Sequence, residues 1–92
     1  LLDLSVDALV FRDLKSRSAV LRNRKTGRAV QVDFPDCPYF LLWHKPNAPY
    51  ICLEPWDGIG DRVGAGVDLT EKEGIRRLAK GDIYRATHTL TV

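Results

Sequence analysis

The stretch YICLEPWDG, residues 50–58, decides how the rest of the chain is interpreted. Its first four residues are aromatic, β-branched, small or aliphatic and follow Pro49, a composition that favours a β-strand. Side chains alternate across a strand, so Cys52 and Glu54 share one face. Because the other face is also apolar, we expect the strand to be buried on both sides and to stop pairing at Pro55. Glu54 then lies at the mouth of a buried strand.

A carboxylate in this position has two interpretations. Beside the indole of Trp56 and ahead of the glycine-rich residues 57–66, Glu54 is suited to act as a general base. Alternatively, Glu54 is structural and is satisfied by a nearby arginine or backbone amide. Structural ion pairs greatly outnumber catalytic ones, so the residue pattern alone favours the structural interpretation.

Short runs of strand-forming residues, bounded by turn residues, recur along the chain. Residues 18–24 and 28–34 flank a turn in which Gly27 can take positive φ, which predicts a hairpin. Residues 39–43 are continuously apolar and predict a strand buried on both faces. Several short strands without a long helix predict an all-β fold, an antiparallel β-sandwich. We also expect strands at 8–11, 74–78 and 82–92, and single helical turns before residue 8 and at the capping-box pair Thr70 and Glu73.

The histidines and cysteines do not form an obvious site. Residues 82–92 alternate clearly and place His88 on the apolar face, so we expect it in the core, whereas His44 begins a proline-bounded turn and should be exposed. Together with Cys37 and Cys52 they do not match a zinc spacing. We therefore expect no metal and no cofactor, and two buried free thiols.

Composition narrows the class of protein further. The chain has 92 residues, enough for one domain, with 45% hydrophobic residues and a net charge of +2, too weak to indicate nucleic-acid binding. The cations between residues 12 and 28 have no aromatic side chains among them for base stacking, so we expect a solvated outer sheet face. We find no apolar stretch of membrane-spanning length and no signal-peptide pattern, and expect a cytoplasmic protein without membrane contact.

The glycines of residues 57–66 do not fit a dinucleotide or phosphate loop. Since the chain contains no Met, we expect a piece of a longer protein.

The order of these features resembles a known family. The segment CLEPWDGIGD, residues 52–61, resembles the catalytic segment of the aldose 1-epimerase (galactose mutarotase) superfamily, particularly its bacterial mutarotase-like branch of the lactose-operon type. The resemblance covers nearly all 92 residues but only the C-terminal part of the family's longer domain. Its other matching segments are DALVF (7–11), LKSR (14–17), TGRAV (26–30), LW (42–43), KEGI (72–75) and KGD (80–82).

This resemblance implies a fold and an activity. The fold is the C-terminal portion of a galactose mutarotase-like supersandwich, with residues 1–92 as a single domain portion. The activity is that of an isomerase of carbohydrate metabolism that interconverts the α and β anomers of a sugar. Glu54 is implied as the general base, Asp7 as a sugar-binding residue and Trp56 as a sugar-stacking face.

The family's acid histidine lies upstream of this stretch, and His44 and His88 do not match it. We therefore expect the chain alone to be inactive. We also expect it to associate with itself, or with the missing N-terminal part, through open strand edges.

Two other functions remain open. One is a non-catalytic carbohydrate-binding or partner-binding β module that uses Trp43, Trp56 and the glycine-rich loop. The other is an epimerase that acts on sugar 6-phosphates, recognised by arginines such as Arg62.

Overall fold

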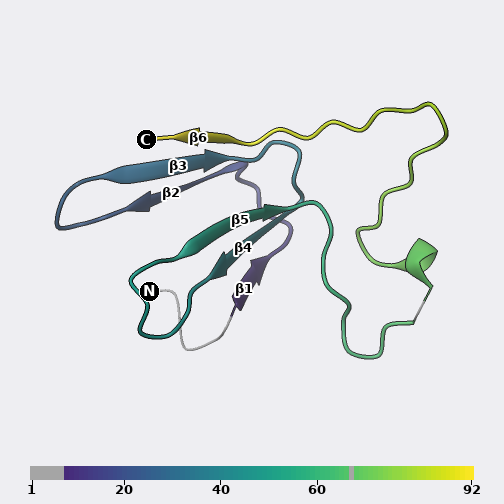
Figure 1. The fold of residues 1–92 in the computed structure, drawn as a ribbon, viewed down its shortest axis with the longest axis horizontal. Coiled ribbons are helices and arrows are strands. Elements are labelled where there is room, and N and C mark those ends of the chain that lie inside the picture. Colours follow the sequence, from purple (N-terminus) through teal and green to yellow (C-terminus); the bar gives the residue numbers. More distant parts are fainter. Residues whose placement is uncertain (1–7, 67) are drawn as a thin grey trace.

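The computed structural model describes residues 8–66 and 68–92, and within them the chain is almost wholly β. Two three-stranded sheets have the orders β1-β4-β5 and β2-β3-β6, and every pair is antiparallel (Figure 1). This confirms the predicted fold class. The elements are β1 (Ala8–Phe11), β2 (Ser18–Arg22), β3 (Ala29–Asp33), β4 (Tyr39–Trp43), β5 (Cys52–Trp56), the 3₁₀ turn η1 (Leu69–Glu71) and β6 (Thr89–Thr91).

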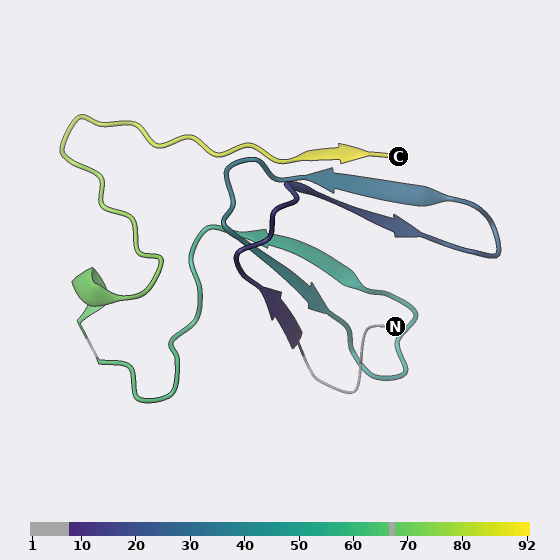
Figure 2. The ribbon, with the colours of Figure 1, turned by 180° about the vertical axis from the view of Figure 1, so that it is seen from behind.

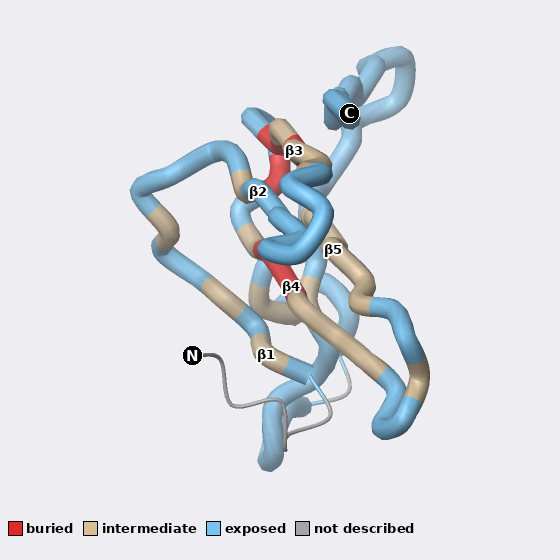
Figure 3. Tube along the Cα trace, turned by 90° about the vertical axis from the view of Figure 1, so that its left-hand side faces the viewer, coloured by how far each residue is buried: buried red, intermediate tan, exposed pale blue. Residues whose placement is uncertain are grey.

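The core lies between the two sheets, where the chain passes from β3 to β4. Val32 and Phe34 are only 2% and 1% exposed, and the ring of Phe34 stacks on that of Phe40 with centroids 4.8 Å apart. Figures 1 and 2 show the two sheets as separate layers, and Figure 3 shows the buried segments grouped around β3 and β4. The arrangement is a β-sandwich. Side chains from both sheets and from the connection between β1 and β2 pack around this centre: Phe11, Leu14, Ala19, Leu42 and Leu53.

The predicted hairpin is confirmed. β2 and β3 pair from Ser18 opposite Asp33 to Arg22 opposite Ala29. The turn between them places Gly27 at φ +76°, and its amide donates to the carbonyl of Asn23 at 2.8 Å. Every cation between residues 12 and 28 is exposed, as expected for a solvated surface.

β5 differs from the prediction in its bounds and in its burial. Pro55 lies within the strand, opposite Phe40, and pairing continues to Trp56. Among the described strands β5 is at the edge of its sheet, where a proline is tolerated because no neighbour needs its missing N–H. For the same reason the strand is half-buried throughout, and Tyr50 just before it is 49% exposed. The expectation of burial on both faces was therefore wrong.

The C-terminal third also differs from the prediction. No strand forms at residues 74–78; instead the amide of Ile75 donates to the carbonyl of Lys72 at 3.1 Å, and Gly74 has φ +77°. The expected strand 82–92 is reduced to β6, and His88 is exposed rather than packed in the core. β6 pairs with β3 only as far as Thr89 opposite Asp33, where β3 ends. Residues before Thr89 therefore have no strand beside them.

The single helical turn near residue 70 is confirmed, but its cap was assigned wrongly. Asp68 caps η1, since its Oδ1 accepts from the amide of Thr70 at 2.9 Å, while Glu73 is bound to arginines. The helical turn expected before residue 8 lies outside the described residues. In the described part of the chain no helix has the length and apolar character needed to cross a membrane.

Candidate functional site

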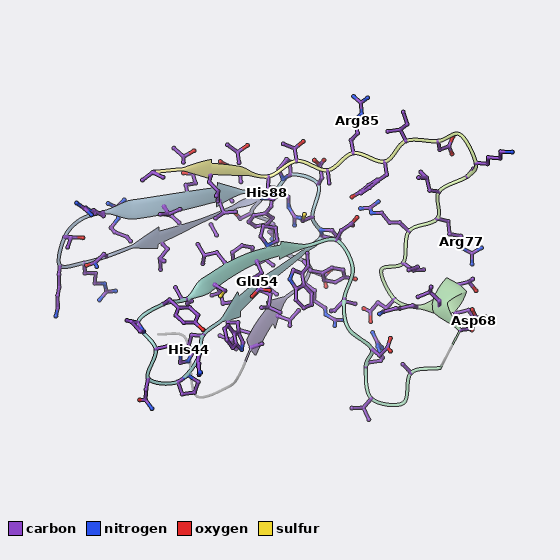
Figure 4. The ribbon with its side chains drawn as sticks, in the orientation of Figure 1. His44, Glu54, Asp68, Arg77, Arg85 and His88 are labelled. Atoms are coloured by element: carbon purple, nitrogen blue, oxygen red, sulfur yellow. The ribbon has the colours of Figure 1, made fainter. Side chains whose placement is uncertain are left out.

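Glu54 lies on the face of the β1-β4-β5 sheet that points away from the other sheet. Leu53 and Leu42 are opposite each other on β5 and β4, and both pack against the core. Because side chains alternate along a strand, Glu54 and its cross-strand neighbour Leu41 point to the opposite face. Figure 4 labels Glu54 on β5. The sequence prediction that Glu54 shares a face with Cys52 agrees with this register.

The carboxylate of Glu54 is bound by the indole of Trp56. Trp56 Nε1 donates to Glu54 Oε2 at 3.0 Å, and both side chains are half-buried. The two residues are neighbours on one face because they are two positions apart on a strand. Within residues 8–66 and 68–92, no lysine, arginine or backbone amide is paired with Glu54, in contrast to the structural interpretation of the sequence pattern. An uncharged donor fixes this carboxylate without neutralising it.

Aromatic side chains surround the carboxylate on the same face. Tyr39 lies opposite Trp56 across the strands, and Trp43 lies opposite Cys52. The rings of Trp43 and Tyr50 are tilted against each other with centroids 6.0 Å apart. A half-buried carboxylate among aromatic rings presents both a proton acceptor and flat apolar faces, the combination used to hold small amphipathic molecules.

The glycine-rich loop is fastened beside this face by one ion cluster. Glu73 binds Arg12, directly after β1, at 3.0 Å and also binds Arg62 in the loop. The hydrogen bond from Arg62 is the largest cause of the lowered pKa of Glu73. A second pair, Lys72 with Asp61, lies next to it at 3.5 Å. All of these groups except Arg12 line an open cavity of about 370 Å³.

The same segment touches the sheet at Gly74. A Cβ atom at this glycine would lie 3.1 Å from the hydroxyl oxygen of Tyr39, so the turn approaches the Tyr39 ring closely. Tyr39 is the cross-strand neighbour of Trp56. The turn after Glu73 thus approaches the cross-strand neighbour of Trp56.

A second cluster fastens the chain directly after β5. Arg76 Nε lies 2.6 Å from both carboxylate oxygens of Asp57, the Tyr84 hydroxyl donates to Asp57, and the Arg76 guanidinium lies 4.9 Å from the centre of the Tyr84 ring. Partial burial acts to raise the pKa of Asp57, but the bonds from Tyr84 and Arg76 together lower it. Sequence reasoning missed this cluster because its members are 19 and 27 residues from Asp57, without any local pattern.

The remaining predicted residues are dispersed. His88 precedes β6 of the other sheet, and His44 follows β4 and is half-buried rather than exposed (Figure 4). Asp7 lies outside the described residues. Cys37 and Cys52 are both free, as predicted, but only Cys37 is fully buried. Burial is the main cause of the raised pKa of the Cys37 thiol. The described residues contain no group of three or more potential metal ligands.

Comparisons with known proteins give relatives of one kind. Two proteins of Lactococcus lactis subsp. lactis, the plasmid and chromosomal forms of Protein LacX, are each 37% identical to this chain over 89 residues. The match covers 96% of this chain, which spans about 30% of the length of these curated relatives. No protein-family model and no solved structure matches the chain. The chain is thus an antiparallel β-sandwich related in sequence to the LacX proteins.

Proposed function

We propose that this chain is part of an aldose 1-epimerase-like protein that interconverts the α and β anomers of a free sugar, with Glu54 as the general base. The main support is the carboxylate of Glu54, half-buried on an aromatic face and bound by an indole N–H instead of a cation. The similarity to the LacX proteins and the resemblance of residues 52–61 to the epimerase catalytic segment also support it.

The reaction needs one proton acceptor and one proton donor. Glu54 removes the proton from the anomeric hydroxyl while an acid protonates the ring oxygen, so that the bond between the ring oxygen and the anomeric carbon breaks and a carbonyl forms. Rotation about the adjacent carbon–carbon bond, followed by the reverse proton transfers, closes the ring as the other anomer. A positioned base contributes roughly 10²–10⁴-fold to such a step. In the family that the sequence resembles the acid is a histidine, and we propose that polypeptide beyond these 92 residues supplies it.

Substrate binding is assigned on the same basis. We propose that Asp7 hydrogen-bonds sugar hydroxyls and that the ring face of Trp56 packs against the sugar. The partners of the chain are then a monosaccharide and the remainder of the domain.

The inner face of the second sheet is only partly covered, which supports the idea of a larger domain. Leu90 lies opposite the buried Val32 in the β2-β3-β6 sheet, yet Leu90 is 63% exposed, and Leu21 on the same face is 40% exposed. β2 and β6 each have one described neighbour only, so both present free edges that can template pairing. We propose that residues 1–92 are a single unit, and that strands of a larger β-sandwich cover its edges and the uncovered part of this inner face.

Replacement of Glu54 by glutamine tests the function. The amide keeps the shape and still accepts the Trp56 hydrogen bond, so folding should be intact, while anomer interconversion should fall roughly 10²-fold or more. Polarimetry on a freshly dissolved α-sugar, run on the product of the complete reading frame, measures the rate. The matched control is Glu71→Gln, the same chemical change at an exposed residue, which should keep the wild-type rate. Unchanged interconversion in a well-folded Glu54→Gln variant would remove the base assignment.

The aromatic pair of Trp43 and Tyr50 favours a second candidate, a non-catalytic carbohydrate-binding module. Such a module binds a sugar without speeding the interconversion of its anomers. Glu54→Gln then changes neither the sugar affinity nor the rate of interconversion. The sugar 6-phosphate alternative has less support, because Arg62 is already bound to Glu73. Rates measured on a free sugar and on its 6-phosphate distinguish these two substrates.

A further inference from the structure

We infer that Trp56 is a positioning residue for Glu54: its indole N–H fixes the carboxylate in the geometry needed for proton abstraction, while its ring face stays available to the sugar. This rests on the proposed function of Glu54 as the base. The observation behind it is the hydrogen bond of 3.0 Å from Trp56 Nε1 to Glu54 Oε2. The bond occupies one carboxylate oxygen and leaves Oε1 to accept the proton.

The indole is itself held in place by its surroundings. Tyr39 lies opposite it across the strands, and the close approach of Gly74 restricts the Tyr39 ring in turn. The residue that follows Trp56 is Asp57, which Arg76 and Tyr84 fasten. A glutamate side chain has several rotatable bonds. A hydrogen-bond donor that is itself held by Tyr39 and by the fastened Asp57 restricts these bonds before the reaction, so less conformational entropy is lost during it.

The uncharged indole N–H of Trp56 is a suitable hydrogen-bond donor for a carboxylate that acts as a base. A lysine or arginine in the same place would favour the charged form of the carboxylate and so oppose its protonation. The indole N–H carries no charge and can only donate, so it orients the carboxylate and cannot itself compete for the substrate proton. The geometry therefore assigns the N–H edge and the ring face of Trp56 to two separate tasks.

The variant Trp56→Phe separates these tasks, since it keeps a ring face and removes the N–H. We expect kcat for anomer interconversion to fall roughly 10- to 100-fold, the range for a misplaced catalytic group, with KM changed less than about twofold. In a Glu54→Gln background the same change should cause no further loss, because Trp56 acts through Glu54. A loss that multiplies with that of Glu54→Gln, or a change confined to KM, would overturn the inference.

A second measurement does not depend on activity. The indole N–H proton resonance of Trp56, assigned by its loss in Trp56→Phe, should shift in Glu54→Gln because its acceptor changes from a carboxylate to an amide. An unchanged resonance would refute the contact on which the inference rests. The two hypotheses fail differently. If Glu54→Gln keeps the full rate, the proposed function is wrong, whereas a fully active Trp56→Phe with an inactive Glu54→Gln overturns only the role of Trp56.

Discussion

Replacing Phe34 by alanine is the most direct test of how the two sheets are held together. Phe34 is 1% exposed and stacks on Phe40 at 4.8 Å, so its ring connects the end of β3 to β4. The Arg17 guanidinium also lies over this ring, 5.8 Å from its centre. Truncation of a fully buried phenylalanine costs about 3–5 kcal/mol in the free energy of unfolding. That is a large fraction of the roughly 5–15 kcal/mol that stabilises a whole domain.

Urea-induced unfolding followed by tryptophan fluorescence measures this loss. Phe34→Leu keeps most of the volume and should cost less than about 1.5 kcal/mol. Val63→Ala removes methyl groups from a side chain that is 105% exposed, and should change stability by no more than about 0.5 kcal/mol. If Phe34→Ala destabilises the protein as little as Val63→Ala does, the ring is not the centre of the core and the described packing of the sheets is wrong.

Three further predictions follow from the loop, the ion clusters and the open edges. Gly74→Ala should destabilise the protein more than Gly64→Ala in thermal melts, since both glycines have positive φ but only Gly74 would place a Cβ against Tyr39; equal effects would argue against that contact. Asp57 and Glu73 have lowered pKa values in the fold, so they release protons on folding. The stability that they contribute is therefore present at pH values above the ordinary carboxyl pKa and is lost as pH falls through the lowered pKa values. Proteolysis of residues 57–84 should therefore speed up in acid, and Asp57→Asn should flatten this pH dependence; a protease acting equally at pH 6 and in acid on the wild type would contradict it. The isolated 92-residue chain should self-associate in light scattering, because its strand edges and the face around Leu90 are open; a stable monomer would count against the larger domain.

The central strands could be predicted from sequence because their signals are local. The hairpin follows from alternation on both sides of Gly27, and β4 follows from an uninterrupted apolar run, with the observed bounds Tyr39–Trp43. The predicted strand began at Tyr50 and stopped before Pro55, whereas β5 spans Cys52–Trp56. Its end was misplaced because Pro55 was taken as a terminator. A proline ends a central strand but not an edge strand, and which strand lies at an edge depends on the order of the sheet.

The C-terminal segment shows where alternation is insufficient. Residues 82–92 alternate well, yet only Thr89–Thr91 pair, since β3 ends at Asp33 and offers nothing to pair with residues before Thr89. A strand needs a neighbour of matching length as well as an amphipathic pattern. The exposed position of His88 follows from that missing neighbour.

The candidate site was predictable only where its members are close in sequence. Glu54 and Trp56 are two residues apart, so strand periodicity places them together. Arg12 and Glu73 are 61 residues apart, and neither has a local signal that distinguishes it from any other surface charge. The clusters that fasten the loop therefore needed the fold.

The edge position of β5 changes the chemical argument about Glu54. A carboxylate buried on both sides of a strand would be well desolvated, but a sugar could not reach it. At the edge of the described strands of its sheet, Glu54 is half-buried, its carboxylate accepts from Trp56, and Leu41 lies opposite it on β4. A general base needs both contact with the proton that it removes and a defined orientation. The partial exposure that the sequence prediction did not foresee is thus what a base on this face requires. The indole N–H supplies the orientation that burial would otherwise have to provide.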